Sequence, residues 1–367
     1  MNITFTRSST IYDESRATKE IFAFLDKGYH VTVLGWDRSG GAEQYCEDLF
    51  RNYSSTISFK FYSGSIGNTK IDKILSRGKW NKWLMNELSQ QKEIDVIHAC
   101  DYDTGAAVRR FAKKNRIKYV YDIYDYYIDA HPVPGLLRNV IERDEIKTIN
   151  ESTVTIICTE ERREQIKKAN PSNVVVIHNS PDVEKQEAYD EEFDYVYCGS
   201  LYDGRLIGEI LRDYQKHPEF KFVFAGSGKY ASVAEELDKK QNHFTFYGSV
   251  PYSTVIDIEM KSKVISAIYE PTIRNHQLCA PNKFYEALAL SKPLIVCRGT
   301  GIDKVVEEND IGIVINYDVN EFYEALQKLC SDEAVRLTMG IRAREIYDKK
   351  YKWSIMRQRL IQVYESL

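Results

Sequence analysis

Residues 280–296 have the sequence Ala-Pro-Asn-Lys-Phe-Tyr-Glu-Ala-Leu-Ala-Leu-Ser-Lys-Pro-Leu-Ile-Val, which predicts a turn, an amphipathic helix and a buried strand in close succession. Pro281 suits the first helical turn, where a missing amide proton costs nothing, and the remaining free amides of that turn can bind an anion. Glu286 can accept two hydrogen bonds from a vicinal diol such as a ribose, while Lys283 supplies positive charge beside a diphosphate. The stretch therefore predicts a nucleotide-sugar site, although the same residues are also ordinary at a solvated helix start.

The chain alternates strand-like and helix-like segments on both sides of this stretch. Runs rich in Val, Ile, Tyr or Phe predict strands at 2–6, 31–35, 57–62, 94–99, 118–123, 153–158 and 173–178, and then at 194–198, 220–225, 243–247, 263–267, 293–297 and 311–315. Helices are predicted between them at 14–27, 41–52, 70–91, 103–115, 137–150 and 160–169, and then at 204–216, 230–241, 252–260, 281–290, 302–307 and 318–331. This alternation is typical of α/β proteins with doubly wound parallel sheets.

One polar stretch, 179–192, interrupts the alternation and predicts a hinge between two domains. A chain of 367 residues can build two cores, since a single core stops growing near about 250 residues. We therefore predict two Rossmann-like domains, 1–180 and 181–350. A ligand is expected in the cleft between them, at the carboxyl ends of both sheets.

Composition indicates a cytoplasmic enzyme. The 7 cysteines lie far apart without a C-x-x-C pair, so neither a disulfide framework nor a zinc site is expected. The amino terminus reads as a strand rather than a signal peptide, and no apolar run approaches the roughly 20 residues that cross a bilayer. The net charge of −4 argues against a general nucleic-acid binder.

Basic residues concentrate between Lys60 and Lys92. There, cationic and apolar side chains interleave: Lys70, Lys73, Arg77, Lys79 and Lys82 with Ile71, Ile74, Leu75, Trp80, Trp83 and Leu84. The pattern suits a basic amphipathic helix on the anionic inner face of the cell membrane, with tryptophans at the interface. The alternative is that the apolar stripe packs on the sheet and the lysines face water.

Several motifs, taken in order, resemble the group 1 (family four) retaining glycosyltransferases of the GT-B fold. The closest likeness is the Asn282-Lys283-Phe284-Tyr285-Glu286 helix followed by the Ser291-Lys292-Pro293 strand entry. The other similar segments are 176–182 at the hinge, the glycine turns 195–201 and 222–228, and the Trp-containing tail 351–367, which is expected to cross back to the first domain.

This resemblance implies a nucleotide-sugar donor site in the second domain. The implied donor-binding residues are Gly199, Ser200, Gly226, Gly228, Val250, Asn275, His276, Pro281, Asn282 and Glu286. Relatives hold the diphosphate with an Arg and a Lys after the first glycine turn. This chain has Ser200 near the first of these positions and Arg205 near the second, so Arg205 is expected to clamp the phosphates, assisted by Lys283.

Two features of this domain depart from known patterns. Position 278, where relatives usually have a second glutamate, is Leu278, which leaves Asn275, His276 and Gln277 to contact the donor sugar. The Gly226–Lys229 turn is not a Walker A loop, because the required first glycine and the following Ser or Thr are absent. A nucleobase beside the glycine backbone is expected there instead.

The acceptor side is expected in the first domain. The loop 7–16 carries hydroxyls and opposite charges, and we assign Thr10, Asp13 and Arg16 to it. Its alternative is structural, with Asp13 capping helix 14–27 and Arg16 pairing with Glu20.

Three further positions complete that side. Tyr124 stands where many relatives have a histidine that touches the donor sugar, and Asp125 is expected to bind sugar hydroxyls or the incoming nucleophile. Asp101-Tyr102-Asp103 could form an Asp-x-Asp metal motif. Asp103 with Thr104 fits a helix cap better, so we assign Asp101 to the acceptor site instead. His98, at the end of a predicted strand, is expected to be a core or rim histidine rather than a catalyst.

The sequence therefore predicts a retaining transferase that moves a sugar from a nucleoside diphosphate to a glycan hydroxyl, in cell-surface polysaccharide or lipid-linked glycan synthesis. No metal or other cofactor is expected, because Arg205, Lys283 and helix amides can stabilise the leaving diphosphate. The alternatives are a sugar-nucleotide epimerase of the same fold, which Leu278 disfavours, and a sugar-nucleotide-binding protein without turnover.

Overall fold

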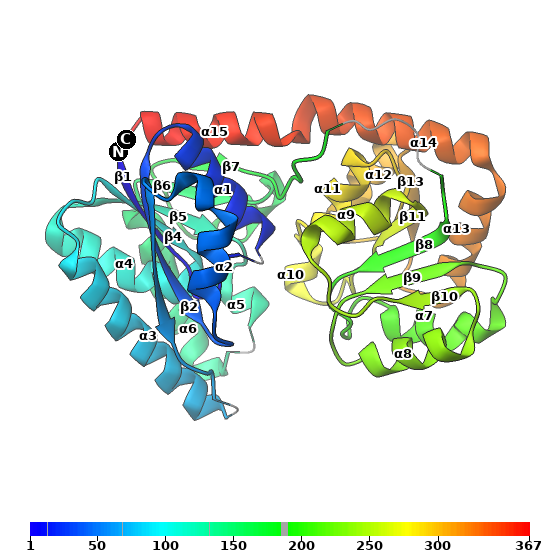
Figure 1. Cartoon of the computed structure of the whole chain (residues 1–367), viewed down its shortest axis with the longest axis horizontal. Helices are drawn as coiled ribbons and strands as arrows, with labels where there is room; N and C mark the ends of the chain where they lie inside the picture. Colours follow the sequence, from blue (N-terminus) through cyan, green and yellow to red (C-terminus); the bar gives the residue numbers. More distant parts are fainter. Residues whose placement is uncertain (13, 68, 132, 185–189) are drawn as a thin grey trace. The chain divides into compact units, whose positions relative to one another are not determined.

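The computed structural model describes residues 1–12, 14–67, 69–131, 133–184 and 190–367. Its backbone divides into two compact units, each built around one parallel sheet (Figure 1). Unit 1 comprises Met1–His178 and Met356–Leu367, and unit 2 comprises Asn179–Ile355. The chain therefore leaves unit 1 next to the predicted hinge and returns to it in the last helix.

Unit 1 contains a sheet of 7 strands in the order β3-β2-β1-β4-β5-β6-β7. The strands are β1 (Asn2–Thr6), β2 (His30–Asp37), β3 (Ile57–Ser63), β4 (Val96–Cys100), β5 (Lys118–Ile123), β6 (Val154–Ile157) and β7 (Val174–Val176). The α-helices are α1 (Ser15–Asp26), α2 (Ala42–Leu49), α3 (Lys70–Gln90), α4 (Asp101–Asn115), α5 (Tyr127–Ala130), α6 (Gly135–Glu151) and most of α15 (Trp353–Glu365). The chain reverses its direction of winding between β1 and β4, so loops diverge at the carboxyl ends of these two strands.

Unit 2 contains a sheet of 6 strands in the order β10-β9-β8-β11-β12-β13. The strands are β8 (Phe193–Cys198), β9 (Phe222–Ala225), β10 (Phe244–Phe246), β11 (Ser262–Ala267), β12 (Leu294–Cys297) and β13 (Gly312–Ile315). The α-helices are α7 (Ile207–Asp213), α8 (Ala231–Lys240), α9 (Tyr252–Met260), α10 (Arg274–Gln277), α11 (Asn282–Ala289), α12 (Ile302–Asn309), α13 (Val319–Ser331) and α14 (Glu333–Ile346). Here the winding reverses between β8 and β11.

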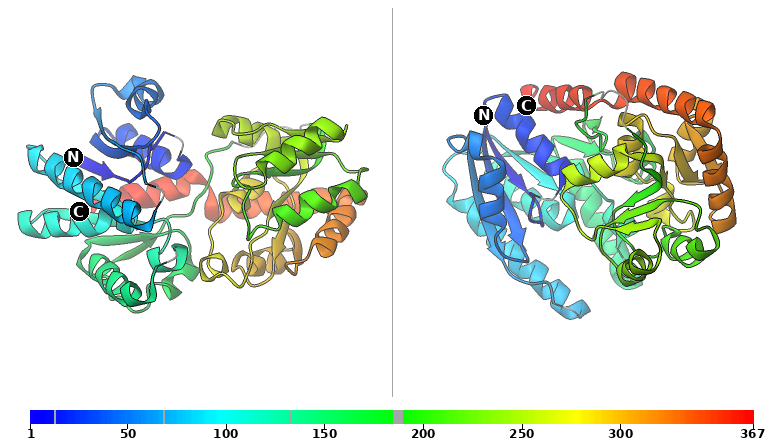
Figure 2. Two further views of the ribbon diagram at one scale, coloured as in Figure 1. Left: turned by 90° about the horizontal axis from the view of Figure 1, so that it is seen from below. Right: turned by 45° about the vertical axis from the view of Figure 1, so that its right-hand side comes forward.

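Helices cover both faces of each sheet (Figure 2). In unit 2, the aromatic core beside α7 and α13 includes Tyr195, Phe222 and Phe322, which are all buried. The residues that alternate with them along the strands, such as Val196 and Val223, are buried against the opposite layer. Burial on both faces explains why these strands read as nearly continuous apolar runs in the sequence.

The tryptophans of α3 face the interior of unit 1. Trp80 is fully buried and stacks on Trp36 with ring centroids 5.7 Å apart, and Trp83 stacks on Trp80 at 5.3 Å. The prediction of a lipid interface is therefore wrong for Trp80, which packs on the sheet as the alternative predicted, while Trp83 is half-buried beside it. Ile74 and Leu75, nearer the start of α3, are 63% and 59% exposed. No helix in the described part of the chain is long and apolar enough to cross a membrane.

The start of α4 differs from the prediction. The helix begins at Asp101 rather than at 103, and the residue before it, Cys100, makes no side-chain cap. Thr104 instead donates its hydroxyl back to the Cys100 carbonyl. Asp103 and Thr104 are therefore in the first helical turn and do not cap it. Asp101 has a positive φ of 59°, which lets its backbone turn from strand into helix.

The glycine turns of unit 2 pack backbone against backbone. A Cβ at Gly226 would lie 1.8 Å from the Gly199 carbonyl oxygen, and the Gly226 φ is +138°. We expect Gly226→Ala to lower the free energy of unfolding by roughly 3 kcal/mol, measured by urea denaturation. Gly248→Ala is the matched control: Gly248 also has a positive φ, +64°, but open space around it, so only about 1–2 kcal/mol should be lost. Equal losses in both variants would contradict the close approach.

Candidate functional site

The carboxyl ends of β8 and β11 form the switch point of unit 2, where α/β sheets bind ligands. The turn after β8 runs through Gly199 to Arg205, and the segment after β11 leads through Tyr269 to α11. Backbone hydrogen bonds fix the glycine turns: Gly199 N donates to Ala225 O at 2.8 Å, and Gly226 N donates to Gly248 O at 2.6 Å. The switch point thus has a rigid backbone floor.

Gly226 and Gly228 allow the backbones of neighbouring turns to pack closely. A Cβ at Gly228 would lie 2.6 Å from the Leu201 carbonyl oxygen. The backbone of the neighbouring turn therefore lies so close that both positions require glycine. From the sequence, a nucleobase was expected beside this glycine backbone. Lys229, the next residue, extends to the surface and pairs with Asp203 at 2.8 Å.

Lys283 lies over the first glycine turn. A Cβ at Gly199 would come within 2.5 Å of its Nζ, so Gly199 leaves the space that this ammonium occupies. The Nζ atom is 4.7 Å from the centroid of the Tyr197 ring. Among the described residues, Lys283 makes no ion pair within salt-bridge distance.

The charge of Lys283 is stabilised by its surroundings. Burial works to lower the pKa of Lys283, but electrostatic interactions with Tyr197, Tyr269 and two carboxyl groups together raise that pKa above its ordinary value. The carboxyl groups of Glu286 and Glu259 act in the same direction. A positive charge is therefore maintained at the switch point across the physiological pH range.

Arg205 lies beside the same aromatic ring. Its guanidinium carbon is 5.5 Å from the Tyr269 ring centroid, and both Arg205 and Lys283 interact electrostatically with the Tyr269 hydroxyl. Burial raises the pKa of Tyr269 to about 12, so the hydroxyl stays neutral. No carboxylate within the described residues pairs with Arg205. Two cations thus flank Tyr269, an arrangement suited to a diphosphate.

His276 extends this cluster. Its ring meets the Tyr269 ring edge-on at a centroid distance of 5.2 Å, and its Nδ1 lies 3.2 Å from the Glu270 carbonyl oxygen. A Cβ at Gly204 would be 3.0 Å from the His276 ring, so Gly204 admits this histidine beside Arg205. The structure therefore brings the predicted residues Arg205, His276 and Lys283 together around Tyr269, which the sequence did not reveal.

Helix α11 directs its amino terminus to the same edge of the sheet. Pro281 is the residue before the helix, with φ −70° and ψ 135°, rather than a member of its first turn. Asn179 Nδ2 donates to the Ala280 carbonyl at 2.8 Å and fixes the approach to the helix. Asn282 is exposed there, while Glu286 is only 3% exposed, one turn further in.

Three predicted donor residues lie around the rim of unit 2. Ser200 is exposed and accepts a hydrogen bond from the Tyr197 hydroxyl at its carbonyl, 2.9 Å away. Val250 follows β10 and is half-buried, and Asn275 lies in the short helix α10.

The buried carboxyl group of Glu259 was not predicted from the sequence. It lies in the last turn of α9 between the buried residues Ile258 and Met260, and it is 0% exposed. The signal available in the sequence was a single glutamate inside the otherwise apolar Ile258-Glu259-Met260 run. Its carboxyl interacts electrostatically with Glu286 and Lys283.

Unit 1 contains a second buried charged cluster, at the carboxyl ends of β4 and β5. Arg16 Nη2 lies 2.8 Å from Asp122 Oδ1, and Arg16 Nε lies 3.1 Å from Glu20 Oε1, as the structural alternative predicted. Arg16 Nη1 also donates to the Ile177 carbonyl at 2.6 Å. The guanidinium, 7% exposed, is thereby fully engaged by unit 1 itself.

Protonation differs within this cluster. Burial works to raise the pKa of Asp122, but Arg16 and His98 together hold that pKa below its ordinary value. Burial, helped by the neighbouring Asp122, raises the pKa of Glu20 well above its ordinary value. Burial lowers the pKa of His98, whose Nδ1 is 2.5 Å from the Tyr364 hydroxyl of α15. His98 is thus a neutral core histidine, in keeping with the expectation from the sequence.

Tyr124 packs beneath two arginines instead of pointing outward. The Arg7 guanidinium carbon lies 3.9 Å from its ring centroid and that of Arg16 lies 4.9 Å away. Its hydroxyl donates inward to Glu20 at 3.4 Å. A ligand contact through this hydroxyl would require the cluster to open.

Asp101 and Asp125 lie closer to the surface of unit 1. Asp101 Oδ1 accepts from the amides of Tyr124 and Asp125 at 2.9 and 3.1 Å, and its Oδ2 accepts from Arg7 at 2.7 Å. Burial, partly opposed by Arg7, raises the pKa of Asp101 to about 6. The Asp125 side chain is 52% exposed and is held by Arg162, a residue that the sequence did not single out.

Thr10 and Asp13 are the other two residues predicted for the acceptor in loop 7–16. Thr10 is half-buried, and its carbonyl accepts from the Cys46 thiol. Asp13 lies outside the described residues. Glu14, the residue before α1, makes no side-chain cap.

One grouping within the described ranges brings potential metal ligands together: His98, Cys100 and Asp122, whose donor atoms lie within 4.8 Å of one another. Arg16 already occupies the Asp122 carboxylate, and Arg7 and Arg16 both act electrostatically on His98. Two buried guanidinium groups oppose a further cation, so these residues do not fit a metal ion.

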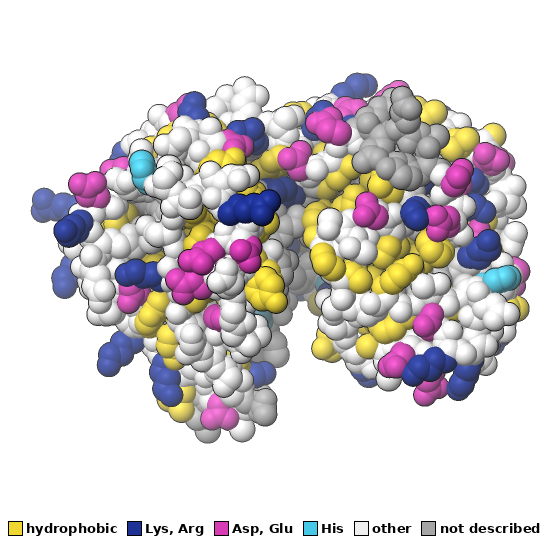
Figure 3. Space-filling view, viewed as in Figure 1, with side chains coloured by type: hydrophobic (Ala, Val, Ile, Leu, Met, Phe, Trp, Pro, Cys, Tyr) yellow, Lys and Arg dark blue, Asp and Glu magenta, His cyan; other side chains and the backbone are white. Residues whose placement is uncertain are grey.

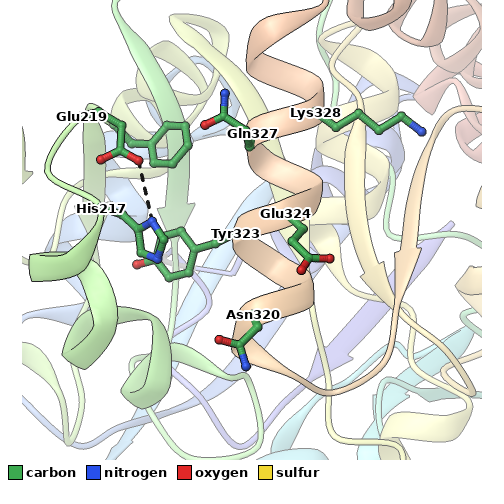
Figure 4. A pocket seen from close by; sticks show the side chains of 8 residues that line it. His217, Glu219, Asn320, Tyr323, Glu324, Gln327 and Lys328 are labelled. Atoms are coloured by element: carbon green, nitrogen blue, oxygen red, sulfur yellow. Dashed lines mark ion pairs between the residues drawn. The ribbon is translucent and has the colours of Figure 1, made fainter.

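A surface hollow of about 570 Å³ lies elsewhere on unit 2 (Figure 4). Asn320, Glu324 and Lys328 of α13 line one side of it, and the His217 ring stacks on Tyr323 with centroids 3.8 Å apart. Phe220, which precedes β9, places this hollow at the amino ends of the strands, opposite the glycine turns. It is therefore separate from the cationic cluster.

The visible surface carries charges of both signs. On the face in Figure 3, Lys and Arg side chains are interspersed with Asp and Glu side chains over both units. This distribution accords with the net charge of −4.

Two family models match the chain, one in each half. The model described as Glycosyltransferase Family 4 matches residues 20–185, and the model described as Glycosyl transferases group 1 matches residues 193–332. Spore coat protein SA of Bacillus subtilis (strain 168) is 26% identical over 168 residues, covering 41% of this chain and 42% of that protein. The chain thus matches less than half the length of this relative.

Solved structures resemble the whole chain. Sucrose-phosphate synthase from Thermosynechococcus elongatus gives a TM-score of 0.75 at 12% identity, covering 100% of this chain and 98% of the other. Anabaena HepE, in complex with UDP and glucose, gives a TM-score of 0.67 at 15% identity, covering 100% of both chains. At such identities the likeness shows the fold, which is the GT-B class predicted from the sequence.

Proposed function

Because the chain belongs to the group 1 glycosyltransferases, we propose that it transfers a sugar from a nucleoside diphosphate to a glycan hydroxyl, with retention of the anomeric configuration. The observation that carries this proposal is the pair of cations, Arg205 and Lys283, around Tyr269 at the switch point of unit 2. The complex of HepE with UDP and glucose supports a nucleotide of this kind.

The proposed chemistry needs few protein groups. Negative charge develops on the diphosphate as its bond to the sugar breaks, and Arg205, Lys283 and the first amides of α11 stabilise it. The acceptor hydroxyl attacks from the face that the diphosphate leaves, and a diphosphate oxygen accepts its proton. Asp125, exposed at the end of β5, is our proposed contact for the acceptor.

The proposed acceptor is a glycan of cell-surface or lipid-linked glycan synthesis. The exposed Ile74 and Leu75 on α3, beside the exposed Lys73 and Lys79, support a peripheral membrane contact. Sedimentation with vesicles containing anionic lipid, compared with neutral vesicles, tests this part of the proposal separately.

We expect UDP, GDP or ADP to raise the melting temperature of the protein, because a ligand that binds only the folded state stabilises it. Glu286→Ala should abolish most of this shift, since Glu286 is the proposed ribose contact. Glu235→Ala, which removes an exposed carboxylate on α8, is the control and should leave the shift unchanged.

Activity is tested by incubating the protein with UDP-sugars and measuring release of UDP. Slow hydrolysis with retained anomeric configuration, followed by NMR, supports a retaining transferase. Nucleotide binding without any release would favour a sensor, and a change of sugar configuration in the intact donor would favour an epimerase.

A further inference from the structure

Two stacked tyrosines lie at the carboxyl edge of the unit 1 sheet. Tyr12 is in the loop after β1, Tyr45 belongs to α2, which follows β2, and their ring centroids are 4.8 Å apart at an interplanar angle of 28°. Tyr12 is half-buried, whereas Tyr45 is 58% exposed. Because one face of the Tyr45 ring rests on Tyr12, the opposite face is the one open to solvent. We call this pair the tyrosine platform.

The backbone around the tyrosine platform is held in an unusual conformation. Ile11, directly before Tyr12, is fully buried and has a positive φ of 69°, which is rare for a β-branched residue. The Thr10 carbonyl accepts from the Cys46 thiol and so ties this loop to α2. Strained backbone persists only where the surrounding structure enforces it, and it is concentrated at binding sites. The fold thus maintains strain next to the residue that supports the exposed ring.

The charges around Tyr45 argue against an anionic ligand. Helix α2 carries Glu43, Glu47 and Asp48, which are all exposed, and it contains no Lys or Arg. These carboxylates repel phosphates, so neither an anionic lipid surface nor a nucleic acid fits this helix. An aromatic face carries partial negative charge and attracts groups with partial positive charge, such as the C–H bonds of a sugar ring. A neutral pyranose therefore matches both the ring and its charged surroundings.

We propose that the tyrosine platform binds a neutral pyranose ring of the acceptor glycan by stacking on the open face of Tyr45. This inference rests on the proposed function, in which Asp125 contacts the acceptor. Asp101 joins the two regions, because its Oδ2 accepts from Arg7 at 2.7 Å and its Oδ1 accepts from the Asp125 amide at 3.1 Å. Arg7 begins the loop that ends at Tyr12, so the platform and Asp125 lie along one edge of the sheet.

The test is saturation-transfer NMR of the full-length protein with the methyl glycosides of glucose, galactose, mannose, rhamnose and N-acetylglucosamine. At least one glycoside should bind, with the strongest transfer to the C–H protons on one face of its ring. Tyr45→Ala should weaken the affinity for that glycoside about tenfold, which corresponds to the loss of one aromatic contact. The increase in melting temperature caused by UDP should be the same in this variant as in the wild type, since the nucleotide site is in unit 2.

Three further variants separate stacking from other effects. Tyr45→Phe keeps the ring and should bind within about twofold of the wild type, whereas Tyr45→Leu keeps an apolar side chain without a ring and should bind as weakly as Tyr45→Ala. Leu49→Ala is the matched control, because Leu49 lies one turn further along α2 and is 42% exposed. Its affinity for the glycoside should not change. Both positions are exposed, so all four variants should melt close to the wild type.

The outcomes distinguish this inference from the proposed function. If UDP raises the melting temperature but no glycoside binds, or if Tyr45→Ala binds the glycoside normally, the tyrosine platform is not a sugar site, and the proposed function stands. If no nucleotide binds while Tyr45→Ala still weakens glycoside binding, the proposed function fails and the platform remains a sugar site. If Tyr45→Ala instead reduces sedimentation with lipid vesicles and leaves glycoside binding intact, the platform is a lipid contact and the inference is overturned.

Discussion

Lys283→Met should reduce the rate of sugar transfer by about 100- to 1000-fold, because removing one donor from a developing anion typically costs that much. The ammonium of Lys283 lies over Gly199, unpaired by any described carboxylate at salt-bridge distance, and interacts with the same tyrosine as Arg205. The variant should also bind the nucleoside diphosphate more weakly. Steady-state release of UDP from the donor, with calorimetry for binding, measures both effects.

Lys229→Met is the matched control for this prediction. Lys229 follows the second glycine turn but pairs with Asp203 at the surface, so its loss should change the rate less than about threefold. A large loss of activity in Lys229→Met, together with normal activity in Lys283→Met, would show that the phosphates bind at the second glycine turn. It would contradict the proposed phosphate site at Lys283.

Arg16→Met should destabilise the protein by about 3–5 kcal/mol, because it leaves the Asp122 carboxylate buried without its partner. The Arg16 guanidinium contacts Asp122 at 2.8 Å, Glu20 at 3.1 Å and the Ile177 carbonyl at 2.6 Å. Urea denaturation measures the loss. Because Asp122 has a lowered pKa when paired, the stabilisation is present at neutral pH and is lost as the pH falls through that value.

The double variant Arg16→Met/Asp122→Leu separates a structural role from the acceptor contact proposed from the sequence. Replacing both partners by apolar groups should restore part of the stability, since no buried charge is left alone. If Arg16→Met keeps its stability but loses transfer to the acceptor, Arg16 is an acceptor contact after all.

The strands were predictable because each one is a short run of β-branched and aromatic residues that is buried on both faces. Each observed strand, from β1 to β13, overlaps a segment predicted from the sequence. The short helices α5 and α10 escaped prediction, because helices of one turn have almost no periodicity to detect. The long helix α14 was also missed. The predicted helix 160–169 shortens to a 3-10 segment, Glu160–Glu164.

The site was only partly predictable. Lys283 and Glu286 could be identified because they lie within one helix at a recognisable spacing. Tyr269 and Glu259 could not, since their roles depend on contacts between segments distant in the sequence. For the same reason, the sequence assigned Tyr124 to a ligand, while the structure places its ring under Arg7 and its hydroxyl toward Glu20.

The hydrogen bond between His98 and Tyr364 has a consequence for biosynthesis. Strand β4 receives this partner from a helix that the ribosome makes only after nearly all of unit 2. Domains at the amino terminus generally fold first during synthesis. In this chain, the sheet of unit 1 is made before the helix that covers its His98 face, so that face stays uncovered until α15 has been synthesised.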